Sequence, residues 1–235
     1  MSSMRSQLEV IVVDDGSNEE SRIESLNGIS GLNMKIIRVE PENKTWHNSC
    51  VPFNMGFEAV TGDIVVYQNA ECLHVGDVLK AAAENVSDNH YVSFACYSVD
   101  VMGLHDINKI NMRKPDYATK INAVIQPTND AHPANDCLNG WYCHSVYNPC
   151  AFHFCAAMTA QDLKALGGFD QRYAGGLAYE DVEILRRIRG RGMSVNIIDQ
   201  PFVVHQAHEP TDYKGKQKYF QRNQHLYHTG QILAD

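Results

Sequence analysis

The strongest constraint on the fold is an alternation of short apolar runs and helix-like segments over about the first 95 residues. The run Leu8–Val13 is β-branched and nearly continuous, which is typical of a strand buried on both faces. Met34–Val39 and Ile64–Tyr67 are predicted as further strands, and the residue spacing after Pro52 and Val78 predicts helices. Strands that alternate with helices indicate a three-layer, Rossmann-like α/β fold with a largely parallel mixed sheet.

The second half of the chain is less regular. Residues 98–149 are rich in Asn, Asp, His and Pro, and a stretch of this kind inside a domain is usually functional or flexible. Order returns with a predicted helix over Tyr179–Gly190 and a late strand at Ser194–Ile198. The segment from residue 206 is polar, and we expect it to contribute little to the core. With no internal repeat, a single domain over residues 1–235 is the simplest account.

Composition excludes several classes of function. The chain has 20 Lys and Arg against 28 Asp and Glu, a net charge of −8, which argues against a nucleic-acid partner. No apolar run approaches the ~20 residues that span a bilayer, and the N-terminus lacks the apolar centre of a signal peptide. Seven cysteines, an odd number, then suggest reduced thiols. We therefore expect a cytoplasmic protein without a transmembrane segment.

Polar groups follow two of the predicted strands directly. Asp14-Asp15-Gly16-Ser17 places two carboxylates where they could bond to a nucleobase or a ribose, although an ordinary strand-to-helix turn favours the same residues. In Asn69-Ala70-Glu71, an amide and a carboxylate at i and i+2 could share a divalent cation with a diphosphate. A simple strand end explains this second pattern equally well.

A third group of polar residues lies late in the chain. Gly167-Gly168-Phe169-Asp170 is a glycine-rich turn, and Glu180-Asp181 follows at the start of a helix, where the helix dipole favours ionised carboxylates. Charge complementarity alone would explain these acids, whereas a functional carboxylate here would be a positioned general base. The Cys and His residues between Cys137 and Cys155 match no common zinc spacing, so we expect buried thiols there and treat a zinc protein as the lesser alternative.

Together these motifs resemble one family. The chain is similar to the GT-A-fold, family-2-type nucleotide-sugar glycosyltransferases, and the resemblance extends over about residues 8–208. The matching runs are V-V-D-D-G-S at Val12–Ser17, N-x-G at Asn54–Gly56 followed by Gly62-Asp63, G-G-F-D at Gly167–Asp170, E-D at Glu180-Asp181, and the histidine run at Val204–His208.

The resemblance implies roles on the donor side. Asp14 and Asp15 would contact the base and ribose of the nucleotide-sugar donor. Glu71 and His205 would hold Mn²⁺ or Mg²⁺ on the diphosphate, with Asn69 close by. Asn54, from the N-x-G motif, would also belong to the donor site.

On the acceptor side, the resemblance makes Asp181 the general base and gives Glu180 a role in positioning acceptor or donor. Trp141 would stack on a sugar face, although a core tryptophan is about as well supported. His208 joins His205 as a group that could stabilise the departing diphosphate.

Two features depart from the family pattern. Asn69-Ala70-Glu71 stands where relatives have D-x-D, so one carboxylate is lost and weaker metal binding, or metal independence, is expected. Only seven residues precede Leu8, too few for the family's first strand and helix, and the predicted fold lacks both.

The resemblance implies transfer of a sugar, with inversion, from a UDP-sugar to a hydroxyl of a glycan or glycoconjugate. Residues 8–97 would form the nucleotide-sugar-binding half, residues 98–205 the acceptor-binding half, and residues 206–235 a polar tail. The alternative is a non-catalytic GT-A-like relative that binds a glycan or a protein partner on the same rim.

Overall fold

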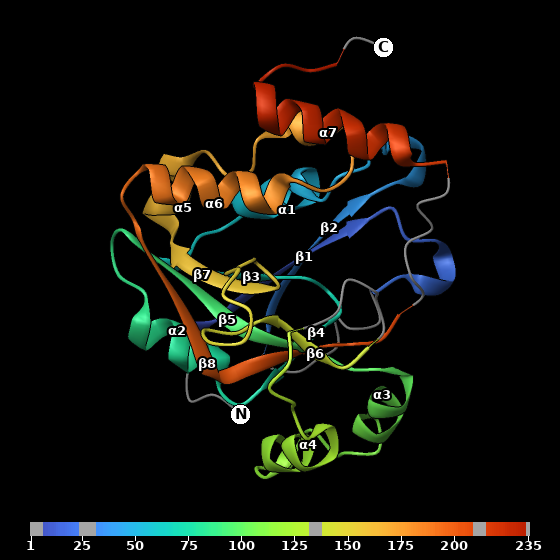
Figure 1. Ribbon diagram of the computed structural model, residues 1–235. Coiled ribbons are helices and arrows are strands. Elements are labelled where there is room, and N and C mark those ends of the chain that lie inside the picture. Colours follow the sequence, from blue (N-terminus) through green and yellow to red (C-terminus); the bar gives the residue numbers. More distant parts are fainter. Residues whose placement is uncertain (1–6, 24–31, 132–137, 209–214, 234–235) are drawn as a thin grey trace. The chain divides into compact units, whose positions relative to one another are not determined.

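The computed structural model of the chain describes residues 7–23, 32–131, 138–208 and 215–233 (Figure 1). These contain the strands β1 (Glu9–Asp15), β2 (Asn33–Val39), β3 (Ile64–Gln68), β4 (Cys72–Val75), β5 (His90–Ser98), β6 (Gly140–Cys143), β7 (Cys155–Thr159) and β8 (Ser194–His205). The α-helices are α1 (Cys50–Glu58), α2 (Val78–Asn85), α3 (Val101–Ile107), α4 (Tyr117–Ile125), α5 (Ala160–Leu166), α6 (Glu180–Gly190) and α7 (Gln217–Thr229). The chain divides into two compact units, each assembled from segments far apart in the sequence.

The first unit comprises residues 64–159 together with the described chain from residue 188 through β8 to His208. Its sheet has the strand order β3-β7-β5-β8-β4, with β6 paired to β5. Only the β5–β8 pair is parallel, and the other pairs are antiparallel. The expected largely parallel sheet is therefore wrong in its strand directions, because apolar patterning reports the burial of a strand and not its direction.

Helices cover both faces of this sheet. Along the central strand β5, Phe94 and Cys96 pack in one apolar cluster with residues of α2. Ala95 and Tyr97 pack in another with residues of α3 and α4. Because successive side chains of a strand point to opposite faces, α2 lies on one face and the α3–α4 pair on the other. These three layers confirm the predicted α/β class.

Part of the irregular 98–149 stretch is ordered in this unit. It contains α3, α4 and β6, and it supplies the buried side chains Ile107 and Ile121. The 98–149 stretch is therefore structural as well as connecting.

The short strand β4, which directly follows the Asn69-Ala70-Glu71 turn, was not predicted from the sequence.

The second unit comprises residues up to 63, residues 160–187 and the C-terminal segment. Its two-stranded sheet pairs β1 with β2 in parallel, in the register Asp14↔Arg38, and α1 packs on β1. The capping-box spacing of Ser17 and Glu20 predicts an α-helix from Ser17 to about Gly28, but the structure has a 3-10 helix at Glu19–Ser21, with Asn18 as its N-cap. The end of that predicted helix lies outside the described residues.

The C-terminal segment is part of this unit's core. Asn223 and Leu226 of α7 are 0% and 1% exposed. The expectation that residues after 206 contribute little to the core is wrong, because a polar helix can bury one apolar face and a fully hydrogen-bonded amide. Among the described residues, no helix combines the length and the apolar character that a membrane crossing requires.

Candidate functional site

The two carboxylates at the end of β1 have different environments. Asp14 is buried, its Oδ1 accepts a hydrogen bond from the Ser17 amide at 2.9 Å, and its Oδ2 lies 3.1 Å from Nη1 of Arg38. Burial by itself would raise the pKa of Asp14, but Ser17 and the Arg38 guanidinium together lower it below its usual value. Asp14 is thus an ionised group that fixes the turn after β1.

Asp15 is turned toward a loop that begins five residues after β2. Its Oδ1 accepts a hydrogen bond from Nε1 of Trp46 at 2.9 Å, and its Oδ2 accepts one from Nζ of Lys44 at 2.6 Å. Trp46 is half-buried. Neither partner was predicted from the sequence, because they lie 29 and 31 residues beyond Asp15 and carry no motif.

The same loop also forms hydrogen bonds with Glu180, the first residue of α6. The Nδ2 of Asn48 donates to Oε2 of Glu180 at 2.6 Å, and the Ser49 hydroxyl lies 3.3 Å from Oε1. Asn48 is buried, and its Oδ1 accepts the Cys50 amide at 2.9 Å at the start of α1. Residues 44–49 therefore contact both the predicted donor-site residue Asp15 and the predicted acceptor-site residue Glu180.

Asp181 has the chemical character expected of a general base. Its burial, together with the negative charge of Glu180, raises the pKa of Asp181 to about 6. Its Oδ1 accepts a hydrogen bond from the Val182 amide at 2.7 Å, in the first turn of α6. A carboxylate with a pKa just below neutral is ionised at pH 7 and is still a useful proton acceptor.

In the first unit, Glu71, His205 and His208 form a candidate metal centre. One ligand atom of each residue lies within 4.8 Å of the others, and Nε2 of His205 is 3.3 Å from Oε1 of Glu71. The pairing Cys72↔His205 between β4 and β8 places these side chains, and the Gln206 amide donates to the Glu71 carbonyl at 3.0 Å. The hydrogen bond from His205 lowers the pKa of Glu71, which keeps it ionised as a ligand must be.

This donor set fits a divalent transition metal. One carboxylate and two imidazoles suit Mn²⁺ better than Mg²⁺, which prefers oxygen ligands. His208, three residues after His205, is a third candidate ligand, whereas the resemblance implies a role for it at the leaving group. Asn69 is half-buried in the turn that leads to Glu71.

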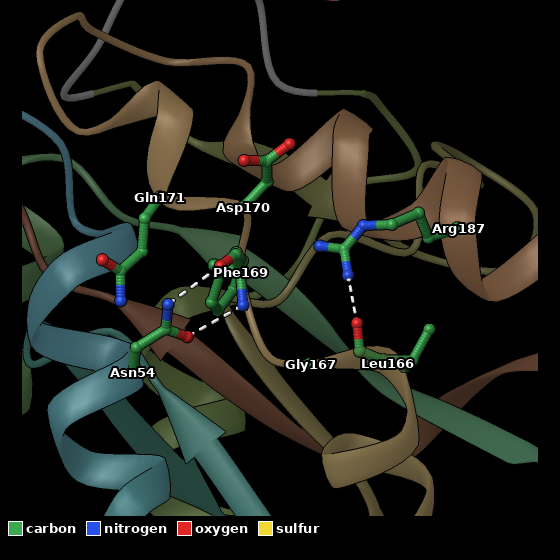
Figure 2. A pocket seen from close by; sticks show the side chains of 7 residues that line it. All are labelled: Asn54, Leu166, Gly167, Phe169, Asp170, Gln171 and Arg187. Carbon is green, nitrogen blue, oxygen red and sulfur yellow. Dashed lines mark hydrogen bonds between the residues drawn. The ribbon is translucent and has the colours of Figure 1, made fainter.

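Asn54 holds the glycine-rich turn. Its Nδ2 donates to the Phe169 carbonyl and its Oδ1 accepts the Phe169 amide, both at 2.8 Å. Figure 2 shows this pair at the edge of a pocket of about 350 Å³ that Gln171 and Arg187 also line. Both ends of the amide are used by the backbone, so Asn54 shapes the turn in this arrangement.

Trp141 lies in the core of the first unit. It is 4% exposed, and its Nε1 donates to the Thr128 carbonyl at 2.7 Å. The rings of Tyr97 and Phe202 pack edge-on against it. Of the two roles considered for Trp141, the structure supports the core tryptophan, because its polar and apolar surfaces are already occupied.

The predicted residues thus fall into two groups. Glu71, His205 and Trp141 belong to the first unit, together with Asn69. The second unit holds the others, which are Asp14, Asp15, Asn54, Glu180 and Asp181. The prediction that all the acids surround one donor stays a prediction.

Comparison with known proteins gives the family. The sequence model described as "Glycosyltransferase like family 2" matches residues 2–226. No curated protein matches the chain in sequence.

Among solved structures, the mannosyltransferase PcManGT from Pyrobaculum calidifontis, in complex with GDP-Man and Mn²⁺, is 17% identical with a TM-score of 0.53. S. aureus TarS 1-349 with UDP-GlcNAc is 14% identical with a TM-score of 0.58. GalNAc-T7 with UDP, GalNAc and Mn²⁺ is also 14% identical, with a TM-score of 0.56.

These structures are longer than the chain studied. The alignments cover 98%, 89% and 85% of this chain, but 57%, 52% and 38% of PcManGT, TarS 1-349 and GalNAc-T7. At such low identity the likeness shows the GT-A fold, and the match of the family model over nearly the whole chain shows the lineage. The chain is a member of the glycosyltransferase-like family 2.

Proposed function

We propose that the protein transfers a sugar from a UDP-sugar to a hydroxyl of a glycan or glycoconjugate, with inversion at the anomeric carbon. Membership of a glycosyltransferase family supports the reaction class. Two of the similar structures carry UDP or a UDP-sugar, which supports the donor. The observation that carries the proposal is Asp181, a carboxylate with a pKa of about 6 in the first turn of α6.

Asp181 is the general base in this proposal. It accepts the proton of the acceptor hydroxyl as the hydroxyl oxygen attacks the anomeric carbon, and the bond from that carbon to the diphosphate oxygen breaks. Attack opposite the leaving group inverts the anomeric centre. Glu180, fixed by Asn48 and Ser49, orients the reactants beside the base.

Trp46 and Lys44 are proposed as donor contacts. Asp15 anchors the half-buried indole through its N–H. A flat aromatic surface of this kind can stack on a nucleobase, and the Lys44 ammonium can attract the anionic donor. Asp14 and Asp15 then act by holding the turn and the Trp46–Lys44 loop, while Asp15 retains a partly exposed carboxylate for the ribose.

Glu71, His205 and His208 would hold the metal ion, with Mn²⁺ favoured by the two imidazoles. Bound there, the ion would supply positive charge to the diphosphate leaving group. His205 is almost wholly buried against the rings of Tyr142 and Phe154, which fixes its orientation. Glu71, the one carboxylate at the position of the family's D-x-D motif, is therefore supported by a rigid imidazole.

The test is Asp181→Asn. Removal of the base should lower the release of UDP from a UDP-sugar, in the presence of acceptor, by about 100-fold or more, while the affinity for the donor in calorimetry stays within about twofold. Asp88→Asn, an exposed aspartate outside the proposed site, is the matched control. An Asp181→Asn protein that transfers sugar at the parental rate would refute the base assignment. A parental protein that releases no nucleoside diphosphate from any sugar nucleotide would instead favour the non-catalytic alternative.

A further inference from the structure

The backbone just before α6 has an unusual conformation. Ala178 and Tyr179 have φ values of 58° and 72°, so two consecutive non-glycine residues are left-handed directly before Glu180. Side chains with a Cβ rarely adopt this conformation, and for an aromatic residue it is a genuine outlier. Such a conformation persists only where the surrounding structure holds it, and outliers of this kind gather at functional sites.

The C-terminal helix supplies the main restraint. Asn223 of α7 is 0% exposed, and its Nδ2 donates to the Ala178 carbonyl at 2.9 Å and to the Tyr173 carbonyl at 3.0 Å. Its Oδ1 accepts a hydrogen bond from Arg222 at 3.0 Å. Asn48 donates to the same Ala178 carbonyl at 3.2 Å. Two buried amides therefore hold one carbonyl at the left-handed pair.

Further contacts from α7 surround the same segment. The Leu177 amide donates to the Tyr219 carbonyl at 3.1 Å, and the Tyr179 ring packs against Phe220 with centroids 5.3 Å apart. A Cβ added at Gly176 would collide with the Asn223 side chain, so the segment approaches α7 as closely as glycine allows. The segment before α6 is thus pressed onto one face of α7 and kept there.

We propose that Asn223 is a positioning residue for Asp181: by holding the Ala178 carbonyl, it maintains the left-handed pair that directs the first turn of α6. The inference rests on the proposed function, in which Asp181 is the general base. Asn223 acts on this segment through the backbone, since its Nδ2 donates to the carbonyls of Tyr173 and Ala178, while its Oδ1 accepts from the Arg222 guanidinium.

The geometry gives the reason for this effect on Asp181. Only Glu180 separates Tyr179 from the base, so a relaxation of either left-handed residue to a negative φ would rotate the first turn of α6. A displacement of about 1 Å in a catalytic group is enough to lower a rate substantially. An amide fixed by three hydrogen bonds is a suitable restraint, because each broken bond would leave a buried polar group unsatisfied.

The experiment compares Asn223→Ala with the double variant Asn223→Ala/Ala178→Gly. We expect Asn223→Ala to lower kcat about tenfold or more, with the donor KM within about twofold of the parent. Glycine adopts the left-handed conformation without strain, so Ala178→Gly in the same background should recover most of the lost kcat. Asn85→Ala is the control, because Asn85 also donates its amide to a backbone carbonyl, at 2.8 Å, but in the first unit. Release of nucleoside diphosphate is followed with UDP-glucose, UDP-galactose, UDP-N-acetylglucosamine and GDP-mannose.

A second measurement reports on the restraint without activity. Hydrogen–deuterium exchange of the amides of residues 177–184 should become faster in Asn223→Ala, remain parental in Asn85→Ala, and slow again in the double variant. Faster exchange with an unchanged kcat, or a loss of kcat that Ala178→Gly does not recover, would overturn the proposal. If the parent hydrolyses no donor, the proposed function fails, whereas unchanged exchange in Asn223→Ala refutes the restraint itself.

Discussion

At the scale of single residues, Asp181 combines two opposed requirements. A general base must be ionised at working pH, yet the burial that tunes its pKa penalises the ionised form. Glu180 adds a second negative charge next to it, and both effects raise the pKa of Asp181 to about 6. The residue that serves the reaction should therefore reduce the stability of the fold at neutral pH.

This loss of folding stability can be measured as a function of pH. Because the pKa in the folded protein exceeds the ordinary value of about 4, the folded state binds a proton that the unfolded state releases between these values. Stability from this group is therefore present below about pH 4 and is lost as the pH rises through about 6. Asp181→Asn should raise the free energy of unfolding by about 3 kcal/mol at pH 7.5 and by only about 0.5 kcal/mol at pH 4.

Urea denaturation of Asp181→Asn, with Asp88→Asn as the control, gives both values. An equal gain in stability at pH 4 and at pH 7.5 would contradict the assignment, since an effect independent of titration cannot come from a buried charge.

Trp46 offers a direct optical test at the same scale. The chain has two tryptophans, and Trp141 is buried whereas Trp46 is half-buried. If the base of the donor stacks on Trp46, UDP should quench the intrinsic fluorescence of the parent and of Trp141→Phe, but not that of Trp46→Phe. Quenching that survives in Trp46→Phe would exclude the stacking role.

At the scale of elements, Arg187 of α6 connects this helix to the glycine-rich turn. Glu183 is 3% exposed on its side chain, and Arg187 contacts its carboxylate at 2.7 and 2.8 Å. The same guanidinium donates to the Leu166 carbonyl at 2.7 Å (Figure 2). It also donates to the Gly168 carbonyl at 2.8 Å. Arg187 therefore joins the helix that carries Asp181 to the turn that follows α5.

Loss of this cation should leave the buried Glu183 carboxylate with only the more distant Arg186, whose Nη2 lies 4.0 Å from Oε1. We expect Arg187→Ala to lower the free energy of unfolding by about 3 kcal/mol, because an uncompensated buried charge is costly. Arg189→Ala, an exposed arginine on the same helix, should change it by less than about 0.5 kcal/mol. Chemical denaturation of the two variants decides the matter, and equal losses would mean that the pair contributes little.

At the scale of the whole molecule, the proposed metal and donor should stabilise the fold together. A ligand that binds only the native state raises stability by about 2.7 kcal/mol at 100 times its dissociation constant. At that concentration, UDP with Mn²⁺ should therefore raise Tm by roughly 5 to 11 °C. Glu71→Gln should remove most of the Mn²⁺-dependent part, whereas Glu84→Gln, an exposed control on α2, should retain it. An identical shift in the presence of a chelator would indicate nucleotide binding without metal.

The sequence was most informative about local features. Apolar runs located the strands β1, β2, β3 and β8 or their cores, and the positions of Asp14, Glu71 and Asp181 at strand or helix ends followed from the motifs. Their partners could not be predicted: Trp46, Asn48 and Asn223 carry no periodic or motif signal, and they reach the site through contacts between distant segments. The strand directions also depended on which segments pair, which residue patterning does not encode.

The sequence by itself determined several of the strands and helices, the family and the residues with chemical potential, because burial patterns and short motifs are contained in neighbouring residues. Only the tertiary structure decided what those residues contact. The pairing of β4 with β8 brings Glu71 to His205, which lies more than 130 residues further along the chain. Asn223 likewise reaches the carbonyl of the left-handed residue Ala178 only after α7 has packed. Long-range pairing of this kind is a property of the packed chain and not of any local segment.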